Sequence, residues 1–160
     1  MLAYEARWDR VGKGALPFAK LAPGSKVIDD IDVSDLESEK QHGYVRFGAS
    51  DQDNVALLAT QPRTGDQDIN DSLEVADGGR MRRSLDRFVA SFHPGKPAKL
   101  VMRVSAEQDT ELVVRVRDAE VGAATIPGGE WVERVVDVPT VAERDAWIEI
   151  ATKSGTSTFN

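Results

Sequence analysis

Short runs in which apolar and polar residues alternate, separated by turn residues, dominate the second half of the chain. They cover residues 99–104, 111–117, 131–138 and 146–150 and are rich in Val and Ile. Glycine, proline, aspartate or charged residues bound each run, beginning with Pro94-Gly95-Lys96-Pro97. Short alternating runs between turn signals are typical of antiparallel strands. The pattern therefore predicts an antiparallel β-sandwich.

The alternation also predicts which side chains face the core, because successive side chains of a strand point to opposite faces. Trp147 is out of phase with Ile148 and Ile150 and should point away from the core. Arg134 falls on the apolar face of its run, which predicts a β-bulge there. The predicted core positions in the other runs include Phe88, Ala90, Phe92, Leu100, Met102, Val104, Leu112, Val114 and Val116.

The first half of the chain carries a weaker form of the same pattern. We expect residues 1–26 to be an irregular lead-in with at most one short strand, because they mix aromatic residues with glycine and proline. The later runs predict strands at 27–33, 44–47, 54–59 and 73–76.

Two local signals punctuate this half. Ser34-Asp35-Leu36-Glu37 has the form of a capping box, with Ser34 as the cap, and predicts a short helix that Gly43 should end. Asp77-Gly78-Gly79 is a strong turn signal after the strand at 73–76.

The whole pattern indicates about eight strands at roughly ten-residue spacing, which favours an all-β, two-sheet jelly roll over a parallel α/β fold. The 160 residues suffice for one domain with its own core. We expect the lead-in at 1–26 and the β-sandwich domain at 27–160. Because strand-like residues stand at its very end, we also expect the chain to be a piece excised from a larger protein.

Charge and composition narrow the classes of partner. The formal net charge of −7 would repel phosphate backbones, which argues against nucleic acid. No apolar run approaches the roughly 20 residues of a membrane span. The chain has no cysteine, so neither a disulfide framework nor a thiolate metal site can form. None of these features indicates the cellular compartment in which the protein is found.

One acidic stretch has the spacing of a metal site. Asp66, Asp68 and Asn70 place oxygen ligands at alternate positions, as hard cations such as calcium require. Asp71, however, stands where an EF-hand loop needs glycine. A solvated acidic loop is the competing interpretation. We predict no catalytic residues, since the chain lacks a G-x-S-x-G nucleophile motif.

Two sets of side chains are candidates for ligand binding. Trp147 and Trp131 could offer a flat apolar ring to a sugar, although Trp147 also suits a protein interface and Trp131 a packed position. Arg80 and Arg82, with Arg83 and Arg87, form a basic cluster that could dock an acidic partner or an anionic glycan. The competing interpretation is a solvated edge strand whose charges prevent aggregation.

Glu39 and His42 are a third set. The functional interpretation of His42 is contact with a glycan or catalysis. The structural interpretation, which we favour, is that His42 and Glu39 tie down a loop by hydrogen bonds.

A series of short motifs carries a resemblance to a known family. In order, they are Pro23-Gly24-Ser25-Lys26-Val27-Ile28-Asp29-Asp30-Ile31, Ser38-Glu39-Lys40-Gln41-His42-Gly43, Asp77-Gly78-Gly79-Arg80 and Pro94-Gly95-Lys96-Pro97-Ala98-Lys99-Leu100-Val101. Their order and spacing resemble the C-terminal β-sandwich domain of bacterial glycoside hydrolases of the β-L-arabinofuranosidase class. The ending, with Val121-Gly122 and the run from Trp131 to Pro139, more broadly resembles galactose-binding-like jelly rolls. The resemblance covers residues 23–150.

The resemblance implies a non-catalytic accessory module of a carbohydrate-active protein, because in those hydrolases the catalytic machinery lies in a separate barrel domain. Such a module would pack on the catalytic domain of the same parent chain or on an oligomer partner, and could touch a glycan. The alternatives are a free-standing, calcium-stabilised carbohydrate-binding module and a purely structural or oligomerising domain. Exposure of Trp147 or Trp131 beside polar groups would favour the free-standing carbohydrate-binding module.

Overall fold

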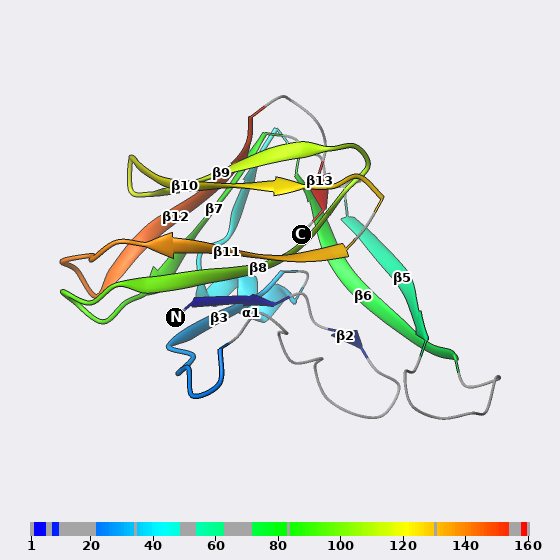
Figure 1. Cartoon of the computed structure of the whole chain (residues 1–160), viewed down its shortest axis with the longest axis horizontal. Helices are drawn as coiled ribbons and strands as arrows, with labels where there is room; N and C mark the ends of the chain where they lie inside the picture. The colour runs from blue at the N-terminus through cyan, green and yellow to red at the C-terminus, as the bar shows by residue number, and fades with distance from the viewer. Residues whose placement is uncertain are drawn as a thin grey trace.

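The computed structural model shows a β-sandwich with one short helix beside it (Figure 1). It describes residues 2–5, 8–9, 22–33, 35–48, 54–62, 72–82, 84–129, 131–153 and 158–159. No helix in these ranges is long and apolar enough to cross a membrane. The predicted two-sheet, all-β sandwich is therefore confirmed, whereas its jelly-roll order stays a prediction.

The first sheet has five strands, all paired antiparallel in the order β10-β9-β12-β7-β4. In that order, the strands are β10 (Ala119–Ile126), β9 (Thr110–Val116), β12 (Asp145–Thr152), β7 (Leu85–Ser91) and β4 (Val45–Phe47). The two long central strands, β12 and β7, pair from Asp145 opposite Ser91 to Ala151 opposite Leu85. The short β4 forms one edge of this sheet.

The second sheet has eight strands, in the order β2-β6-β13-β8-β1-β3, with β5 added to β6 and β11 added to β8. Its pairs are antiparallel except that β1 runs parallel to both β3 and β8. These strands are β1 (Leu2–Glu5), β2 (Trp8–Asp9), β3 (Asp29–Asp32), β5 (Asn54–Pro62), β6 (Ser72–Arg82), β8 (Ala98–Ala106), β11 (Trp131–Val138) and β13 (Thr158–Phe159).

The core lies between the two sheets and is apolar. Phe88 of β7 and Ile148 of β12 are fully buried and lie directly opposite each other in the first sheet. Leu100 and Met102 of β8 contribute the facing side chains of the second sheet. The nine core positions named above, from Phe88 to Val116, are all buried, because a period of two places alternate residues of a strand on its core face.

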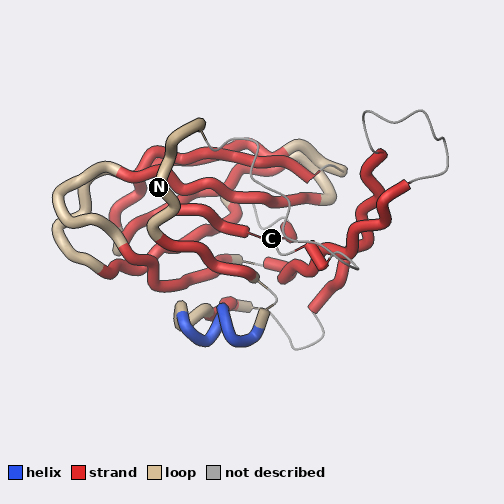
Figure 2. The backbone as a smooth tube through the Cα atoms, turned by 90° about the horizontal axis from the view of Figure 1, so that it is seen from below, coloured by secondary structure: helices blue, strands red, loops and turns tan. Residues whose placement is uncertain are grey.

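The helix α1 (Leu36–Gln41) lies beside the strands, along one side of the sandwich (Figure 2). Its N-cap is Asp35, whose side chain accepts from the backbone N–H groups of Glu37 and Ser38. The prediction that Ser34 is the cap was therefore wrong by one residue, since the Asp35 carboxylate satisfies the free amides of the first turn. Gly43, with φ of 57°, follows the helix as predicted.

Two predicted interruptions of strands are also wrong. Asp77-Gly78-Gly79 lies inside β6, where it pairs with Leu57, Ala56 and Val55 of β5. The backbone hydrogen bonds of that long pair override the local turn preference. At Arg134 there is no bulge, because β11 pairs with β8 in unbroken register from Trp131 to Val138. The Arg134 side chain instead donates to the Thr125 carbonyl of β10, at 2.7 Å.

The lead-in at residues 1–26 contributes more to the sheets than expected. It contains two short strands rather than at most one, and β1 lies between β3 and β8. The proposed boundary at residue 26 stays a prediction.

Truncating Phe88 to Ala should lower the free energy of unfolding by about 3–5 kcal/mol, because it leaves a cavity in the core between the sheets. The matched control is Val135→Ala on β11, at a side chain that is 37% exposed, with an expected loss of under about 1 kcal/mol. Urea unfolding of both variants measures the difference. Equal losses would contradict the placement of Phe88 in the core.

Candidate functional site

The outer face of the five-stranded sheet exposes aromatic side chains beside charged ones. Trp147 of β12 is 43% exposed, and Phe47 of the edge strand β4 is 40% exposed. Val45 of β4 is exposed as well, and Arg87 and Glu149 lie between these side chains on β7 and β12. We call these five residues the aromatic face. The prediction that Trp147 points away from the core is confirmed.

Arg87 holds the aromatic face together. Its guanidinium carbon lies 5.4 Å from the ring centre of Phe47 and 5.7 Å from that of Trp147. Both distances are within the range of cation–π attraction. Arg87 also forms an ion pair with Glu149, which lies directly opposite it on β12, with its Nε 2.7 Å from the Glu149 carboxylate. The guanidinium is thus fixed by two rings and one carboxylate.

The turn between α1 and β4 borders the ring of Trp147. A Cβ atom added at Gly43 would lie 3.8 Å from Cη2 of Trp147, in ordinary van der Waals contact. The preceding carbonyl, of His42, accepts from the backbone N–H of Val89 at 2.8 Å. Val89 in turn pairs with Trp147 across β7 and β12. The turn is therefore hydrogen-bonded to the strand pair that carries Trp147.

Beneath the β4 edge lies a buried pair of opposite charges. Arg82 of β6 and Asp86 of β7 are both fully buried, and Nε of Arg82 donates to the Asp86 carboxylate at 2.9 Å. Burial raises the pKa of Asp86, against the opposing effect of Arg82. Burial, and then the Asp86 charge, raise the pKa of Tyr44 above its ordinary value. Arg82 and Asp86 have no exposed surface that a ligand could reach.

Arg80 lies beside this cluster and binds the helix. Its Nε and one terminal nitrogen donate to the two oxygens of Glu39, at 2.7 and 3.0 Å. This hydrogen bonding raises the pKa of Arg80. We predicted an exposed basic cluster that included Arg80 and Arg82. The expectation that these two side chains are exposed was wrong, because each is buried against a carboxylate.

His42 ties the end of α1 to β3. Its Nδ1 lies 2.7 Å from the Ser38 carbonyl oxygen and its Nε2 lies 3.2 Å from the Asp29 carboxylate. The hydroxyl of Ser38 accepts from the backbone N–H of Asp32 at 2.9 Å, which adds a second link between α1 and β3. The prediction that His42 and Glu39 fasten this segment by hydrogen bonds is confirmed.

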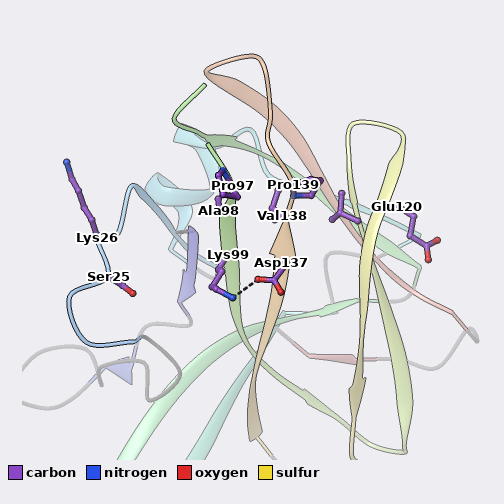
Figure 3. Close-up of a pocket in the computed structure, with 10 residues that line it drawn as sticks. Ser25, Lys26, Pro97, Ala98, Lys99, Glu120, Asp137, Val138 and Pro139 are labelled. Atoms are coloured by element: carbon purple, nitrogen blue, oxygen red, sulfur yellow. Dashed lines mark hydrogen bonds and ion pairs between the residues drawn. The ribbon is translucent and has the colours of Figure 1, made fainter. Parts of the chain in front are cut away.

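A separate groove of about 750 Å³ lies where β8 begins and β11 ends (Figure 3). Pro97, Ala98, Val138 and Pro139 form its apolar part, and Glu120 and Lys26 lie at opposite sides. Lys99 and Asp137 point toward each other across its lower part and form an ion pair. Among the described residues, none of the side chains that line this groove is aromatic. For a sugar ring it offers less stacking surface than the aromatic face.

Several predicted site residues are not tested. Asp66, Asp68 and Asn70 lie outside the described residues, so the calcium site stays a prediction. Trp131 begins β11, but its side chain is not described. Among the described residues, no three His, Cys, Asp or Glu side chains are grouped as a metal ion would need.

Phe47 and Glu149 were missed as site residues. Glu149 is predicted to lie on the same face as Trp147, two residues away on one strand, and this spacing was the available signal. Phe47 gave no comparable signal, because its approach to Arg87 depends on the pairing of β4 with β7.

No family model and no curated protein matches the chain. Among solved structures, it is similar to a glycoside hydrolase family 43 arabinoxylan arabinofuranohydrolase from Bacillus subtilis, in complex with cellotetraose, with a TM-score of 0.38 and 14% sequence identity. The match covers 67% of this chain and 24% of that one, so the chain spans a minor part of that enzyme. The resemblance to the accessory domain of β-L-arabinofuranosidase-type hydrolases stays a prediction.

Replacing Arg82 with Met should lower the free energy of unfolding by about 3–5 kcal/mol near neutral pH, because it removes the cation that is ion-paired with the fully buried Asp86 carboxylate. The loss should shrink as the pH falls from neutral into the acid range, because the Asp86 carboxyl group then takes up a proton and no longer needs a cation. The sign follows from the raised pKa of Asp86, since the stability contributed by its protonated form is present at low pH and disappears as the pH rises.

Urea unfolding of the variant and the wild type across this pH range measures the effect. The matched control is Arg115→Met, because Arg115 lies 3.9 Å from its partner Glu120 and both side chains are partly exposed. Its loss should stay under about 1 kcal/mol at every pH. If the loss of unfolding free energy in Arg82→Met did not change with pH, the attribution of this loss to the charge of Asp86 would be contradicted.

Proposed function

We propose that the chain is a non-catalytic accessory module of a carbohydrate-active protein and that its aromatic face contacts glycan. The single observation that carries this proposal is the pair of exposed rings, Trp147 and Phe47, held on either side of Arg87. Exposure of Trp147 beside polar groups was expected to favour the alternative of a free-standing carbohydrate-binding module, and both alternatives have glycan contact in common. The link to carbohydrate-active proteins rests on the resemblance of residues 23–150.

The chemistry of the aromatic face suits a sugar. An exposed aromatic ring offers a flat, apolar surface against which the C–H groups of a sugar ring can pack. Between the rings, the charged groups of Arg87 and Glu149 can donate to and accept from sugar hydroxyls. Because strands and ion pairs fix these side chains before binding, little conformational entropy is lost when a ligand arrives.

The state of three carboxylates on and near the aromatic face supports a non-catalytic role for this face. A general acid or base must exchange protons with a substrate within hydrogen-bond reach. Glu149 is engaged by Arg87, Glu39 by Arg80 and Asp86 by Arg82. Each of these carboxylates is thus committed to an arginine, and Asp86 is also fully buried.

A second candidate function is protein docking through the same face, against a catalytic domain of the parent chain or an oligomer partner. The observation that favours it is the position of Val45 and Phe47 on an edge strand that pairs, among the described strands, with β7 alone. Unpaired strand edges readily accept another chain, and Trp, Phe and Arg are enriched in protein interfaces. A purely structural domain would use the face in this way as well.

Affinity electrophoresis in gels that contain arabinoxylan, xylan, arabinan or cello-oligosaccharides tests glycan contact. We expect at least one of these glycans to retard the wild-type chain, and Trp147→Ala to weaken that binding by about tenfold or more, as loss of a stacking ring costs over 1 kcal/mol. Val135→Ala, an exposed apolar change on the other sheet, should bind like the wild type.

If a glycan retards Trp147→Ala as strongly as the wild type, the glycan binds outside the aromatic face and the proposal is contradicted. If none of the four glycans retards the wild type, glycan contact is contradicted and docking becomes the better account. Sedimentation velocity of the wild type and Trp147→Ala then tests docking to a second copy, which predicts self-association by the wild type alone.

A further inference from the structure

A row of alternating charges crosses the outer face of the five-stranded sheet, from the aromatic face to β10. Arg87 of β7 lies directly opposite Glu149 of β12, and Glu149 lies opposite Arg115 of β9. Arg115 in turn lies opposite Glu120 of β10. Directly opposite residues of paired strands point to the same face of the sheet, so these four side chains form one line across the strands. We call them the charged row.

A β-bulge in β10 keeps the end of this row on the outer face. The register of β10 against β9 shifts between Glu120 and Gly122, so β10 has one extra residue there. Val121 packs against the core, whereas the Glu120 side chain is 58% exposed beside Arg115. Glu120 therefore continues the row that begins at Arg87.

A second row, of apolar side chains, runs beside the charged row. It begins at Phe47 of β4 and continues through residues that lie opposite one another on the next four strands, which are Leu85, Ala151, Val113 and Ala123. On β7, β12 and β9 the two rows lie two residues apart, which is about 7 Å along a strand. Because valine and alanine side chains are short, this apolar row forms a shallow strip next to the charged groups.

The charged row keeps hydrogen-bonding capacity for a ligand. Both hydrogen bonds from Arg87 go to the same oxygen of Glu149, Oε1, and no described residue donates to its second oxygen. Nη2 of Arg115 lies 3.9 Å from the Glu120 carboxylate, which is too long for a hydrogen bond. Within the described part of the chain, the row thus offers acceptors from two glutamates and donors from Arg115.

The charges of the row favour one class of ligand. Two arginines and two glutamates together carry no net charge, and the whole chain has a formal net charge of −7. An anionic glycan would therefore gain no net attraction. A neutral sugar suits the row, because each hydroxyl both donates and accepts and can bind an arginine and a glutamate at once. The C–H faces of the same sugar rings can pack on the apolar row.

The spacing of the strands sets the direction and the length of the ligand. Neighbouring strands lie about 4.8 Å apart, so the five strands span roughly 19 Å. The step from one strand to the next is close to the length that one sugar ring adds to an extended, linear chain. A glycan that runs across the strands therefore places about one sugar on each strand, beside both rows.

We propose that the charged row and the apolar row form an extended binding site for a linear, neutral glycan, which lies across the strands from Phe47 to Ala123. The inference rests on the proposed function, since the aromatic face supplies the first contacts, and it adds the class of glycan and the direction of its chain. Arg115 and Glu120 contact only those chains that are long enough to reach them. The affinity therefore increases with the number of sugars until the sheet is covered.

Isothermal titration calorimetry with xylo-oligosaccharides and cello-oligosaccharides of increasing length tests the inference. In the series that binds better, the wild-type affinity should rise by about tenfold or more between two and four sugars, because each further sugar gains charge-assisted hydrogen bonds. The affinity should change little beyond about five sugars, where the sheet ends. Oligogalacturonides of the same lengths, which are acidic, should bind about tenfold more weakly or not at all.

Arg115→Met tests the far end of the row. Arg115 is partly exposed and its ion pair with Glu120 is long, so the variant should fold like the wild type. In this variant the rise in affinity between two and four sugars should largely disappear. The matched control is Lys99→Met, which removes one positive charge from an exposed ion pair on the other sheet and should preserve the rise.

Three results would overturn the inference and leave the proposed function standing. They are equal wild-type affinities for two and four sugars, an unchanged rise in Arg115→Met, and oligogalacturonides that bind as strongly as the neutral chains. If no oligosaccharide binds, the proposed function is contradicted, and the inference fails with it. Self-association of the wild type that Arg115→Met abolishes, measured by sedimentation velocity, would identify a second copy as the occupant of the row and would also overturn the inference.

Discussion

The register of β7 against β12 is the constraint on which the rest of the structure depends. In this register Phe88 and Ile148 face each other inside the core, while Arg87 opposite Glu149 and Val89 opposite Trp147 fall on the outer face. Because side chains alternate, a slip of one residue would bury these charges and expose the core residues. The same register therefore determines which side chains stabilise the core and which side chains form the aromatic face.

Ion pairs near the β4 edge position the elements that the pairing of β7 with β12 does not itself position. The strand β4 has three residues and pairs with β7 over these three positions. Arg82 with Asp86, Arg80 with Glu39 and His42 with Asp29 join β6, β7, β3 and α1 around it. Buried pairs of this kind contribute little net stability but specify one arrangement, and here that arrangement places Phe47 and Gly43 beside the other groups of the aromatic face.

Local alternation explains how much the sequence could predict. It identified the burial of Phe88 and Leu112 and the exposure of Trp147, because strand periodicity depends on neighbours in the chain alone. It could not predict that Arg82 is buried, since its partner Asp86 lies on the next strand and the depth of both depends on packing. Nor could it predict the contact of Phe47 with Arg87, which strand pairing creates between distant segments, or the continuation of β6 through Gly78.

The most direct test of the account is to map where a glycan touches the chain, because two concave or flat surfaces compete for that role. Backbone amide signals would be followed while arabinoxylan oligosaccharides are added to the isotope-labelled chain. The account predicts shifts that centre on Phe47, Arg87 and Trp147 and leave the groove around Ala98 and Val138 unchanged. Shifts confined to that groove, or no shift at any residue at saturating oligosaccharide, would contradict it.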